Sequence, residues 1–296
     1  MLATIDVERS ECFLPEDKER IFKLVKDNIG FSELNKLVFE RLRDWVIEVF
    51  EDKIKDPINK EDPQYLNTTA TLYYKQGKYE EAEPLYKKCL KLKRETLGNQ
   101  HFDTLTSINN LALLYEQQGK YEESKLLQEE CFKLEKEVFG NNHPNTLTSM
   151  NNLAALYTKQ GKLNESEILY KECLKLRKEY LGERHLDTLT TMNSLGVLYN
   201  KQGLYDKAQP LYEECLNLRR EILGNRHIMT ITSMNNLGTL YMKQKLYNQA
   251  EILFEECLTI RMEIFGDKNI DTLVIMNNLG NIYENKGLYD KAEILY

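Results

Sequence analysis

Apolar and polar residues alternate with a helical period along most of the chain. In the segment around residues 104–118, Leu105, Ile108, Leu111, Ala112 and Tyr115 follow an i, i+3, i+4, i+7 spacing. This spacing gathers the five side chains into one stripe on the side of an α-helix. The pattern predicts one amphipathic helix over about 104–118 and a second over about 121–139.

The same pair of helices recurs along the chain at an interval of 42 residues. Several residue types keep this interval. They are the cysteines at 89, 131, 173, 215 and 257, the glycines at 98, 140, 182, 224 and 266, and the histidines at 101, 143, 185 and 227. Self-similarity at a fixed period is the sequence signature of a repeat architecture. We therefore treat the chain as an array of helix pairs.

Glycines mark the ends of the predicted helices. Gly119 is expected to end the first helix of its pair and Gly140 the second, because a left-handed backbone is least costly for glycine. Lys245 occupies the position that Gly119 has in its own repeat, and we expect this to cost about 1 kcal/mol. Asp103 is predicted to be an N-cap, because its carboxylate can accept from free backbone N–H groups.

Neither helix of a pair can bury its apolar stripe alone, so neighbouring pairs are expected to stack. Small residues such as Ala154 and Gly196 on the first helix, and Ser166 and Ala208 on the second, allow the helix axes to approach closely. The prediction is an all-α fold, a right-handed α-solenoid of stacked antiparallel helix pairs. It covers residues 61–296, with five full repeats and a truncated sixth.

Residues 1–60 lie outside the repeats. Pro15 is expected to open a helix that reaches about Asn28, and Ser32 a second helix that reaches about Lys55. We interpret this pair as an N-terminal helical cap followed by a connector. Because Tyr296 falls early in the second helix of the sixth repeat, we expect the chain to be a fragment of a longer array or a truncated gene product.

Composition and charge narrow the possible functions. A net charge of −7 and a pI near 5.4 argue against a general affinity for nucleic acid, which needs a clustered basic surface. No apolar run approaches the roughly 18 residues of a membrane helix, and the N-terminus lacks the features of a signal peptide. We expect a cytoplasmic protein with neither nucleic-acid nor membrane partners.

The cysteines and histidines could suggest a metal or redox site. One residue of each type per repeat places successive side chains about 10 Å apart, too far for a disulfide or a shared metal ion. We interpret the cysteines as packing residues and the histidines as turn residues that bond the start of the next helix. Phosphate-binding and nucleophile motifs are absent from the sequence. We predict no enzymatic activity, no cofactor and no metal.

The repeat resembles a known family. The order Leu111-Ala112-x-x-Tyr115, then a small residue at 124 and an aromatic such as Tyr170 or Tyr212, is similar to the tetratricopeptide consensus. The 42-residue length resembles the repeats of kinesin light chains, whereas the common repeat has about 34 residues. The resemblance covers about 61–296, although Gln128 stands at an aromatic position. It implies a superhelical scaffold that binds other proteins.

The resemblance also implies that one asparagine of each first helix lies on the concave side of the array. There, related scaffolds use amides to hold the backbone of an extended peptide, because an amide both donates and accepts. The corresponding residues are Asn67, Asn109, Asn151, Asn193, Asn235 and Asn277. Second asparagines follow four of them directly, at 110, 152, 236 and 278. The alternative is a structural ladder of amides between neighbouring first helices.

A further position lies eight residues after each of these asparagines and is lysine in four repeats. Its helical phase places Lys75, Lys159, Lys201 and Lys243 near the same side. In an acidic protein this stripe of positive charge would attract an acidic peptide, unless the lysines are only solvated surface residues.

Together these features predict a protein–protein interaction scaffold that binds an extended, acidic peptide in its concave groove. Two alternatives fit the same residues. The chain could be a cargo adaptor of the kinesin light chain kind, although the heptads that join a light chain to its motor are absent from residues 1–60. It could also be the repeat tail of a larger signalling protein.

Overall fold

The computed structural model describes residues 61–296 and divides the chain into two compact units, Met1–Lys120 and Tyr121–Tyr296. Residues 61–296 contain twelve α-helices and no strand. Consecutive helices pack as antiparallel pairs within each unit, which confirms the predicted all-α stack of helix pairs. The predicted N-terminal cap, with its helices over 15–28 and 32–55, lies outside the described residues.

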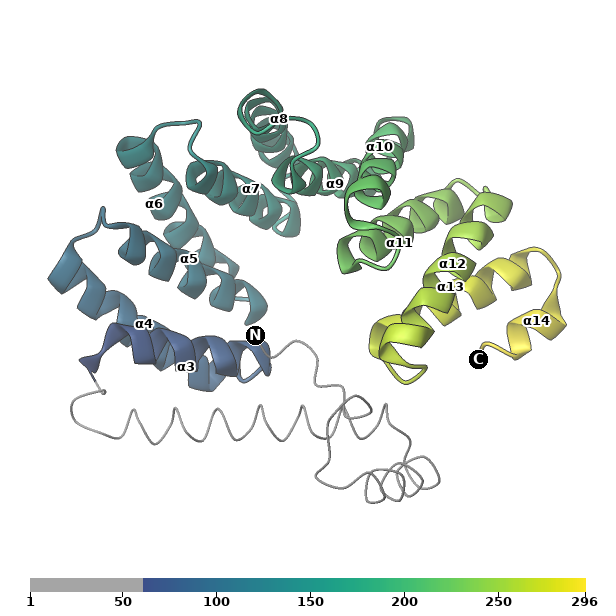
Figure 1. The fold of residues 1–296 in the computed structure, drawn as a ribbon, viewed down its shortest axis with the longest axis horizontal. Helices are drawn as coiled ribbons and strands as arrows, with labels where there is room; N and C mark the ends of the chain where they lie inside the picture. The colour runs from purple at the N-terminus through teal and green to yellow at the C-terminus, as the bar shows by residue number, and fades with distance from the viewer. Residues whose placement is uncertain (1–60) are drawn as a thin grey trace, which may run out of the picture. The chain divides into compact units, whose positions relative to one another are not determined.

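The first unit holds three described helices. They are α3 (Pro63–Lys75), α4 (Tyr79–Leu97) and α5 (Phe102–Gln117). Helix α4 packs against both α3 and α5 (Figure 1). We call the first helix of each repeat helix A and the second helix B, so α3 and α5 are A helices and α4 is a B helix.

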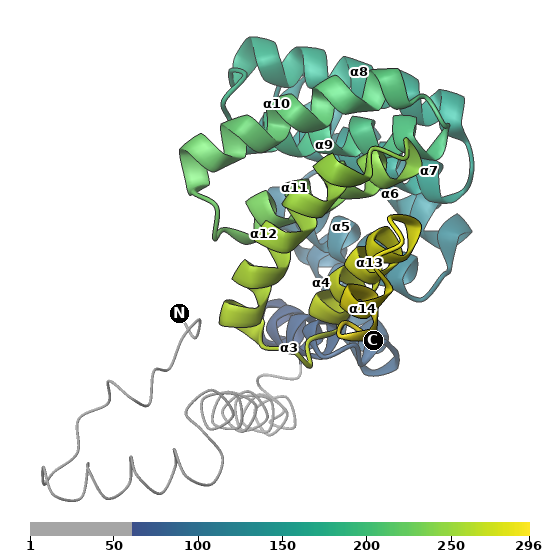
Figure 2. The ribbon, with the colours of Figure 1, turned by 90° about the vertical axis from the view of Figure 1, so that its right-hand side faces the viewer.

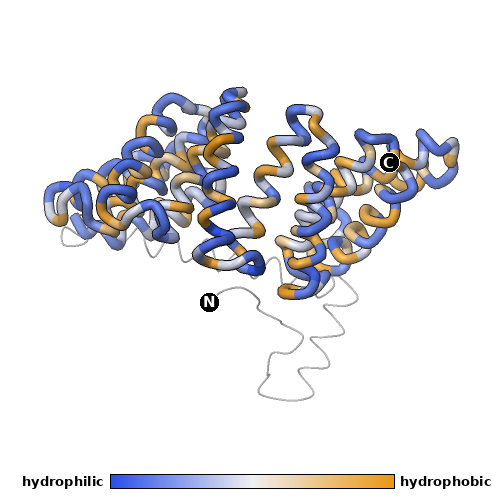
Figure 3. The backbone as a smooth tube through the Cα atoms, turned by 90° about the horizontal axis from the view of Figure 1, so that it is seen from above, coloured by the Kyte–Doolittle hydropathy of each residue, from blue (hydrophilic) through white to orange (hydrophobic). Residues whose placement is uncertain are grey.

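The second unit continues this alternation and begins with a B helix. Its helices are α6 (Tyr121–Phe139), α7 (Pro144–Lys159), α8 (Leu163–Tyr180), α9 (Leu186–Lys201), α10 (Tyr205–Leu223), α11 (Ile228–Lys243), α12 (Tyr247–Phe265), α13 (Ile270–Asn285) and α14 (Tyr289–Glu293). Each helix packs against the next, and α8 and α10 form a layer over α9 (Figure 2). Hydrophobic and hydrophilic residues alternate along these helices, as an amphipathic pattern requires (Figure 3).

The helix boundaries follow the sequence pattern closely, with one correction at the start of helix A. Helix α6 covers the predicted range, whereas α5 begins at Phe102 and its N-cap is His101. The prediction that Asp103 caps this helix was wrong, because Nδ1 of His101 accepts from the backbone N–H of Asp103 at 3.2 Å. Equivalent bonds begin the A helices at the other three histidines, His143, His185 and His227. The predicted turn role of the histidines is thus confirmed.

The glycines take the backbone conformation that the sequence suggested. Gly119 and Gly140 have φ values of 75° and 85°. Lys245 also lies in the left-handed region, with φ of 61°, and is the only non-glycine residue to do so among residues 61–296. The strain predicted for Lys245 therefore has a structural basis.

Close approach of helix A to its own helix B is clearest in the fourth repeat. A Cβ atom at Gly196 would lie only 2.7 Å from the Tyr212 ring, which is almost completely buried. Ser166 makes a related contact in the third repeat, where its hydroxyl donates to the carbonyl of Ala154 at 2.7 Å. These contacts confirm the predicted packing of small residues between the two helices of a pair.

The five cysteines of the repeat series are buried free thiols that join three helices. The thiol of Cys173 on α8 donates to the carbonyl of Leu147 on α7 at 3.2 Å and lies 3.7 Å from the hydroxyl of Thr191 on α9. Burial raises the pKa of Cys131 and of Cys257 to about 12, so both thiols are protonated and unreactive at neutral pH. The cysteines are packing residues, as predicted.

Candidate functional site

The candidate site is the side of the A helices that no other helix of the second unit covers. Helices α7, α9, α11 and α13 touch one another in succession. The helices of the second unit follow an arc in Figure 1, and α7, α9 and α11 lie on its inner side. Residues three and eleven positions apart share one side of a helix. This rule places nine residues on one side of their helices, which we call the inner face: Thr148, Asn151, Lys159, Thr190, Asn193, Lys201, Thr232, Asn235 and Lys243.

The predicted asparagines are half-buried along these helices, apart from Asn277, which is exposed. We call the passage from one A helix to the next a step. The amide ladder considered as an alternative exists at two such steps. Asn236 donates to Oδ1 of Asn193 at 3.0 Å, and Asn110 donates to Oδ1 of Asn67 at 3.2 Å. These bonds join neighbouring A helices and orient the first amide of each pair.

Two further asparagines of the series also turn their oxygen atoms into the helix stack. Oδ1 of Asn151 and Oδ1 of Asn235 are buried and have no hydrogen-bond partner among residues 61–296. In the repeat after Asn151, the residue that would donate is Ser194 instead of asparagine. In these amides, as in those of Asn67 and Asn193, the remaining Nδ2 group is a pure donor. The amides can thus offer a ligand hydrogen-bond donors, but few acceptors.

The predicted lysines lie at one end of the A helices. Lys159, Lys201 and Lys243 are the last residues of α7, α9 and α11, and all three are exposed. The ammonium group of Lys201 donates to the carbonyl of Thr158 at 2.7 Å, and that of Lys243 donates to Oδ1 of Asn200 at 3.0 Å. Each of these two lysines therefore reaches the preceding A helix. In the first unit, Lys75 is the last residue of α3 and is also exposed.

A second set of cations, which the sequence pattern did not single out, lies four residues after the cysteines on helix B. Arg177 and Arg219 are each only 3% exposed. Nη1 of Arg177 donates to the carbonyl of Asp187 and to the hydroxyl of Thr191, both at 2.8 Å. Its Nη2 donates to the hydroxyl of Thr148 on the inner face at 3.1 Å. The guanidinium thus lies between two A helices, close to the inner face.

Arg219 repeats this arrangement one step further along the unit. It donates to the carbonyl of Met229, to the hydroxyl of Ser233 at 2.7 Å and to the hydroxyl of Thr190 at 3.4 Å. Burial lowers the pKa of Arg219. Among residues 61–296, no carboxylate forms an ion pair with Arg177 or Arg219. Within the described part of the chain, both are thus buried cations without an ion-pair partner, and the 42-residue spacing of the arginines was the available signal.

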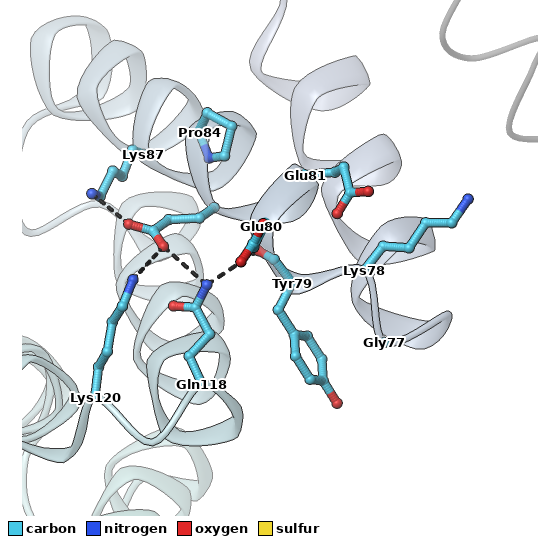
Figure 4. Close-up of a pocket in the computed structure, with 10 residues that line it drawn as sticks. Gly77, Lys78, Tyr79, Glu80, Glu81, Pro84, Lys87, Gln118 and Lys120 are labelled. Atoms are coloured by element: carbon cyan, nitrogen blue, oxygen red, sulfur yellow. Dashed lines mark hydrogen bonds and ion pairs between the residues drawn. The ribbon is translucent and has the colours of Figure 1, made fainter.

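A separate pocket of about 760 Å³ lies in the first unit, beside the turn between α3 and α4 (Figure 4). Glu83 is bonded there to Lys87, Lys120 and Gln118, at 2.6, 2.7 and 2.9 Å. Burial raises the pKa of the Glu83 carboxyl, but these three bonds outweigh it and lower the pKa to about 2. Because the Glu83 carboxylate is already bonded to Lys87, Lys120 and Gln118, we interpret the pocket as a structural network, and it contains none of the predicted binding residues.

Residues 61–296 contain no group of three or more His, Cys, Asp or Glu side chains placed to hold a metal ion. In the same range, no helix combines the length and apolar character needed to cross a lipid bilayer.

Known proteins resemble the chain at the level of the repeat and of the fold. A tetratricopeptide repeat family model matches residues 64–136, 127–179, 147–221, 187–261 and 229–296. None of the curated proteins matches the sequence. The crystal structure of BtubC (BKLC) from P. vanneervenii has a TM-score of 0.62 and 23% identity, and the match covers 76% of this chain and 92% of that one.

Two further solved structures are similar to this chain in fold. Both show the nearly identical TPR-like repeats of a Podosopora anserina protein described as a kinesin light chain. One of them, a form with a single substitution, has a TM-score of 0.59 and 22% identity, with 70% of this chain and 97% of that chain covered. The other structure has a TM-score of 0.57 and 23% identity, with 69% and 99% covered. At these identities the likeness concerns the fold alone.

Proposed function

The chain belongs to the tetratricopeptide repeat family and is a protein-interaction scaffold, and we propose that its inner face binds an extended peptide that carries Asp or Glu. The observation that carries this proposal is the set of hydrogen-bond donors on the inner face and directly beneath it. Amide Nδ2 groups, lysine ammonium groups and buried guanidinium groups are all hydrogen-bond donors. The ligand that complements them supplies acceptors, namely main-chain carbonyls and carboxylates.

The charges of the site support an acidic ligand in particular. The whole chain has a net charge of −7, whereas the inner face of the second unit has three exposed lysines and lies above two buried arginines. A buried cation without a counter-ion is costly, and a nearby carboxylate from a ligand lowers that cost. The lysines also attract an acidic peptide from a distance, so binding is expected to weaken as salt rises.

The test begins with a peptide that binds the purified chain, selected from an array of acidic 12-residue peptides. Replacement of Lys159, Lys201 and Lys243 by glutamate is expected to weaken this peptide by at least about tenfold, because three attractive charges become repulsive. Fluorescence polarisation at low and high salt measures the affinity. The weakening should be largest at low salt.

A control variant makes the same change of charge on helix B. Lys133, Lys136 and Lys175 are exposed on α6 and α8, and their replacement by glutamate leaves the inner face intact. This variant should lose far less affinity than the first. Equal losses in the two variants would show that net charge, and not the inner face, determines binding.

A cargo adaptor of the kinesin light chain kind is a second candidate, favoured by the similarity of fold to a Podosopora anserina protein with kinesin light chain repeats. This function predicts that the chain captures a motor heavy chain in a pull-down. Absence of capture under conditions in which the acidic peptide binds would favour the general scaffold.

A further inference from the structure

One B helix of the second unit breaks the pattern of buried cations. The residue of α6 that corresponds to Arg177 and Arg219 is Glu135, which is 6% exposed. A buried carboxylate therefore lies between α6 and the first turn of α7, where the next two repeats have a guanidinium. The sign of the buried charge reverses at this one step.

The surroundings of Glu135 are still those of a buried cation. Ser149 corresponds to Thr191, which accepts from Arg177, and the carbonyl of Asn145 corresponds to that of Asp187. Burial raises the pKa of Glu135, while hydrogen bonds from Ser149 and Cys131 lower it. Its Oε2 atom is buried and has no hydrogen-bond partner in the range 61–296 that the structure describes. The position that holds a guanidinium in the next two repeats thus holds a carboxyl group here, so this step offers no cation to an acidic ligand.

Towards the C-terminal end of the second unit, the buried arginine is present but is neutralised by an aspartate. Arg261 on α12 continues the arginine series and is 6% exposed, but Asp271 pairs with it at 2.7 Å. Asn269 accepts a further bond from Arg261 at 3.0 Å. The unpaired buried cations of the second unit are consequently confined to two neighbouring steps, at Arg177 and Arg219. An acidic step precedes them and a neutralised step follows.

The spacing of the steps translates into positions along a peptide. Neighbouring helices lie about 8–10 Å apart, and an extended chain advances about 3.3 Å per residue. One step of the inner face therefore corresponds to about three residues of an extended ligand. Two acidic residues about three positions apart can lie over Arg177 and Arg219 together.

We propose that Glu135 and Asp271 limit the acidic part of the ligand to two residues about three positions apart and so fix its register on the inner face. This inference rests on the proposed function, since it concerns the same ligand. A third acidic residue on the α7 side meets the field of Glu135. A third acidic residue on the α13 side gains nothing from Arg261, which Asp271 already neutralises.

The test uses defined peptides instead of a natural ligand. Twelve-residue peptides of serine and alanine carry two glutamates that are two, three or four positions apart, or a third glutamate on either side of the best pair. Their affinities are measured for the wild-type chain and for Glu135→Gln, Glu135→Arg and Asp271→Asn. Arginine at 135 meets the partners that Arg177 has, and glutamine removes the charge at nearly constant size, so circular dichroism should show folded proteins.

The wild-type chain is expected to prefer the pair spaced by about three positions, and a third glutamate on one side should weaken binding. In Glu135→Arg the same third glutamate should strengthen binding by about tenfold, and Glu135→Gln should abolish its effect. Asp271→Asn should favour a third glutamate at the opposite end of the peptide. The end of the peptide that responds to each variant thus also shows in which direction the peptide lies on the inner face.

Two results would overturn the inference, and they are distinguishable. If glutamate peptides bind but Glu135→Arg and Glu135→Gln rank them as the wild-type chain does, Glu135 does not set the register. If no glutamate peptide binds better than the plain serine–alanine peptide, the proposed function itself is wrong.

Discussion

Histidine begins four of the A helices by an unusual use of its ring. Nδ1 of His227 accepts from the backbone N–H of Met229 at 3.2 Å, which is the bond that a serine or aspartate side chain makes at most helix starts. Asn269 makes the same bond in the sixth repeat with its amide oxygen, at 3.0 Å. The chain itself therefore shows which residue can replace the histidine.

The cap bond predicts opposite results for two substitutions of one histidine. His227→Ala removes the acceptor and should lower the free energy of unfolding by about 1 kcal/mol, whereas His227→Asn should leave it nearly unchanged. Urea unfolding followed by circular dichroism measures both. Equal losses in alanine and asparagine would mean that the ring contributes by packing and not as a cap.

The strained turn at Lys245 gives a prediction of the opposite sign. Lys245→Gly should raise the free energy of unfolding by about 1 kcal/mol, because glycine adopts a φ of 61° without a Cβ clash. The reverse change at the matching turn, Gly203→Lys, should lower it by a similar amount. A loss of stability in Lys245→Gly would show that the lysine side chain outweighs the strain.

At this scale the sequence predicted the turns but not the cap. Glycines at a fixed interval have one conformational meaning, and the structure bears it out at Gly119 and Gly140. The N-cap was placed at Asp103 because capping rules favour carboxylates. The ring nitrogen of His101 makes the bond instead, and composition rules give it little weight.

At the scale of helices, the fit of helix A against its own helix B varies between repeats. Alanine occupies the contact position in the third repeat and glycine in the fourth, at Ala154 and Gly196. The aromatic residues opposite, Tyr170 and Tyr212, are both buried. The Tyr212 ring lies so close to Gly196 that no Cβ atom fits without movement.

Gly196→Ala tests this packing. The added methyl would lie 2.7 Å from the Tyr212 ring, so the helices must separate, and we expect a loss of about 1–3 kcal/mol. Thermal unfolding of this variant and of Gly196→Ala with Tyr212→Leu measures the effect, since a smaller side chain should recover part of the loss. Undiminished stability in Gly196→Ala alone would contradict the close approach.

The buried arginines show what a sequence pattern hides at this scale. Alternating charges along helix B are typical of a solvated face, and Arg177 is one of several cations near the end of α8. Only the packing of α8 against both α7 and α9 encloses the side chain. Enclosure by three helices depends on distances between repeats, which no single helix pattern specifies.

At the scale of the whole molecule, cysteine thiols and tyrosine hydroxyls with a raised pKa are spread over the repeats. Burial raises the pKa of Cys131 and Cys257 from 9.0 to about 12. Burial, followed by the hydrogen bond to Glu129, raises the pKa of Tyr157 from 10.0 to about 12. The folded array holds these groups neutral to a higher pH than the unfolded chain does.

This difference predicts a loss of stability at alkaline pH. Below about pH 9 the groups are protonated in both states, so their contribution is complete, and it declines as the pH rises towards 12 because only the unfolded chain releases the protons. Urea midpoints at pH 8, 10 and 11.5 should fall in that order. A constant midpoint over this range would show that the thiols and phenols are not enclosed as described.

How far the sequence could define the function also becomes clear at this scale. The repeat length followed from the spacing of recurring residues, and the family resemblance from that length together with the consensus residues around Leu111 and Tyr115. The series at Asn151 and Lys159 was identifiable from the same spacing, but the inward turn of the amide oxygens depends on the neighbouring repeat. The ladder at Asn193 and the missing donor at Ser194 are such differences between repeats.

The central claim is that the ligand lies on the A helices of the second unit and not on the B helices. An acidic array-selected peptide that carries a photoreactive residue, cross-linked to the chain and mapped by mass spectrometry, tests this directly. We expect cross-links to α7, α9 and α11, and we expect added salt to reduce their yield. Cross-links confined to α8, α10 and α12 would contradict the claim.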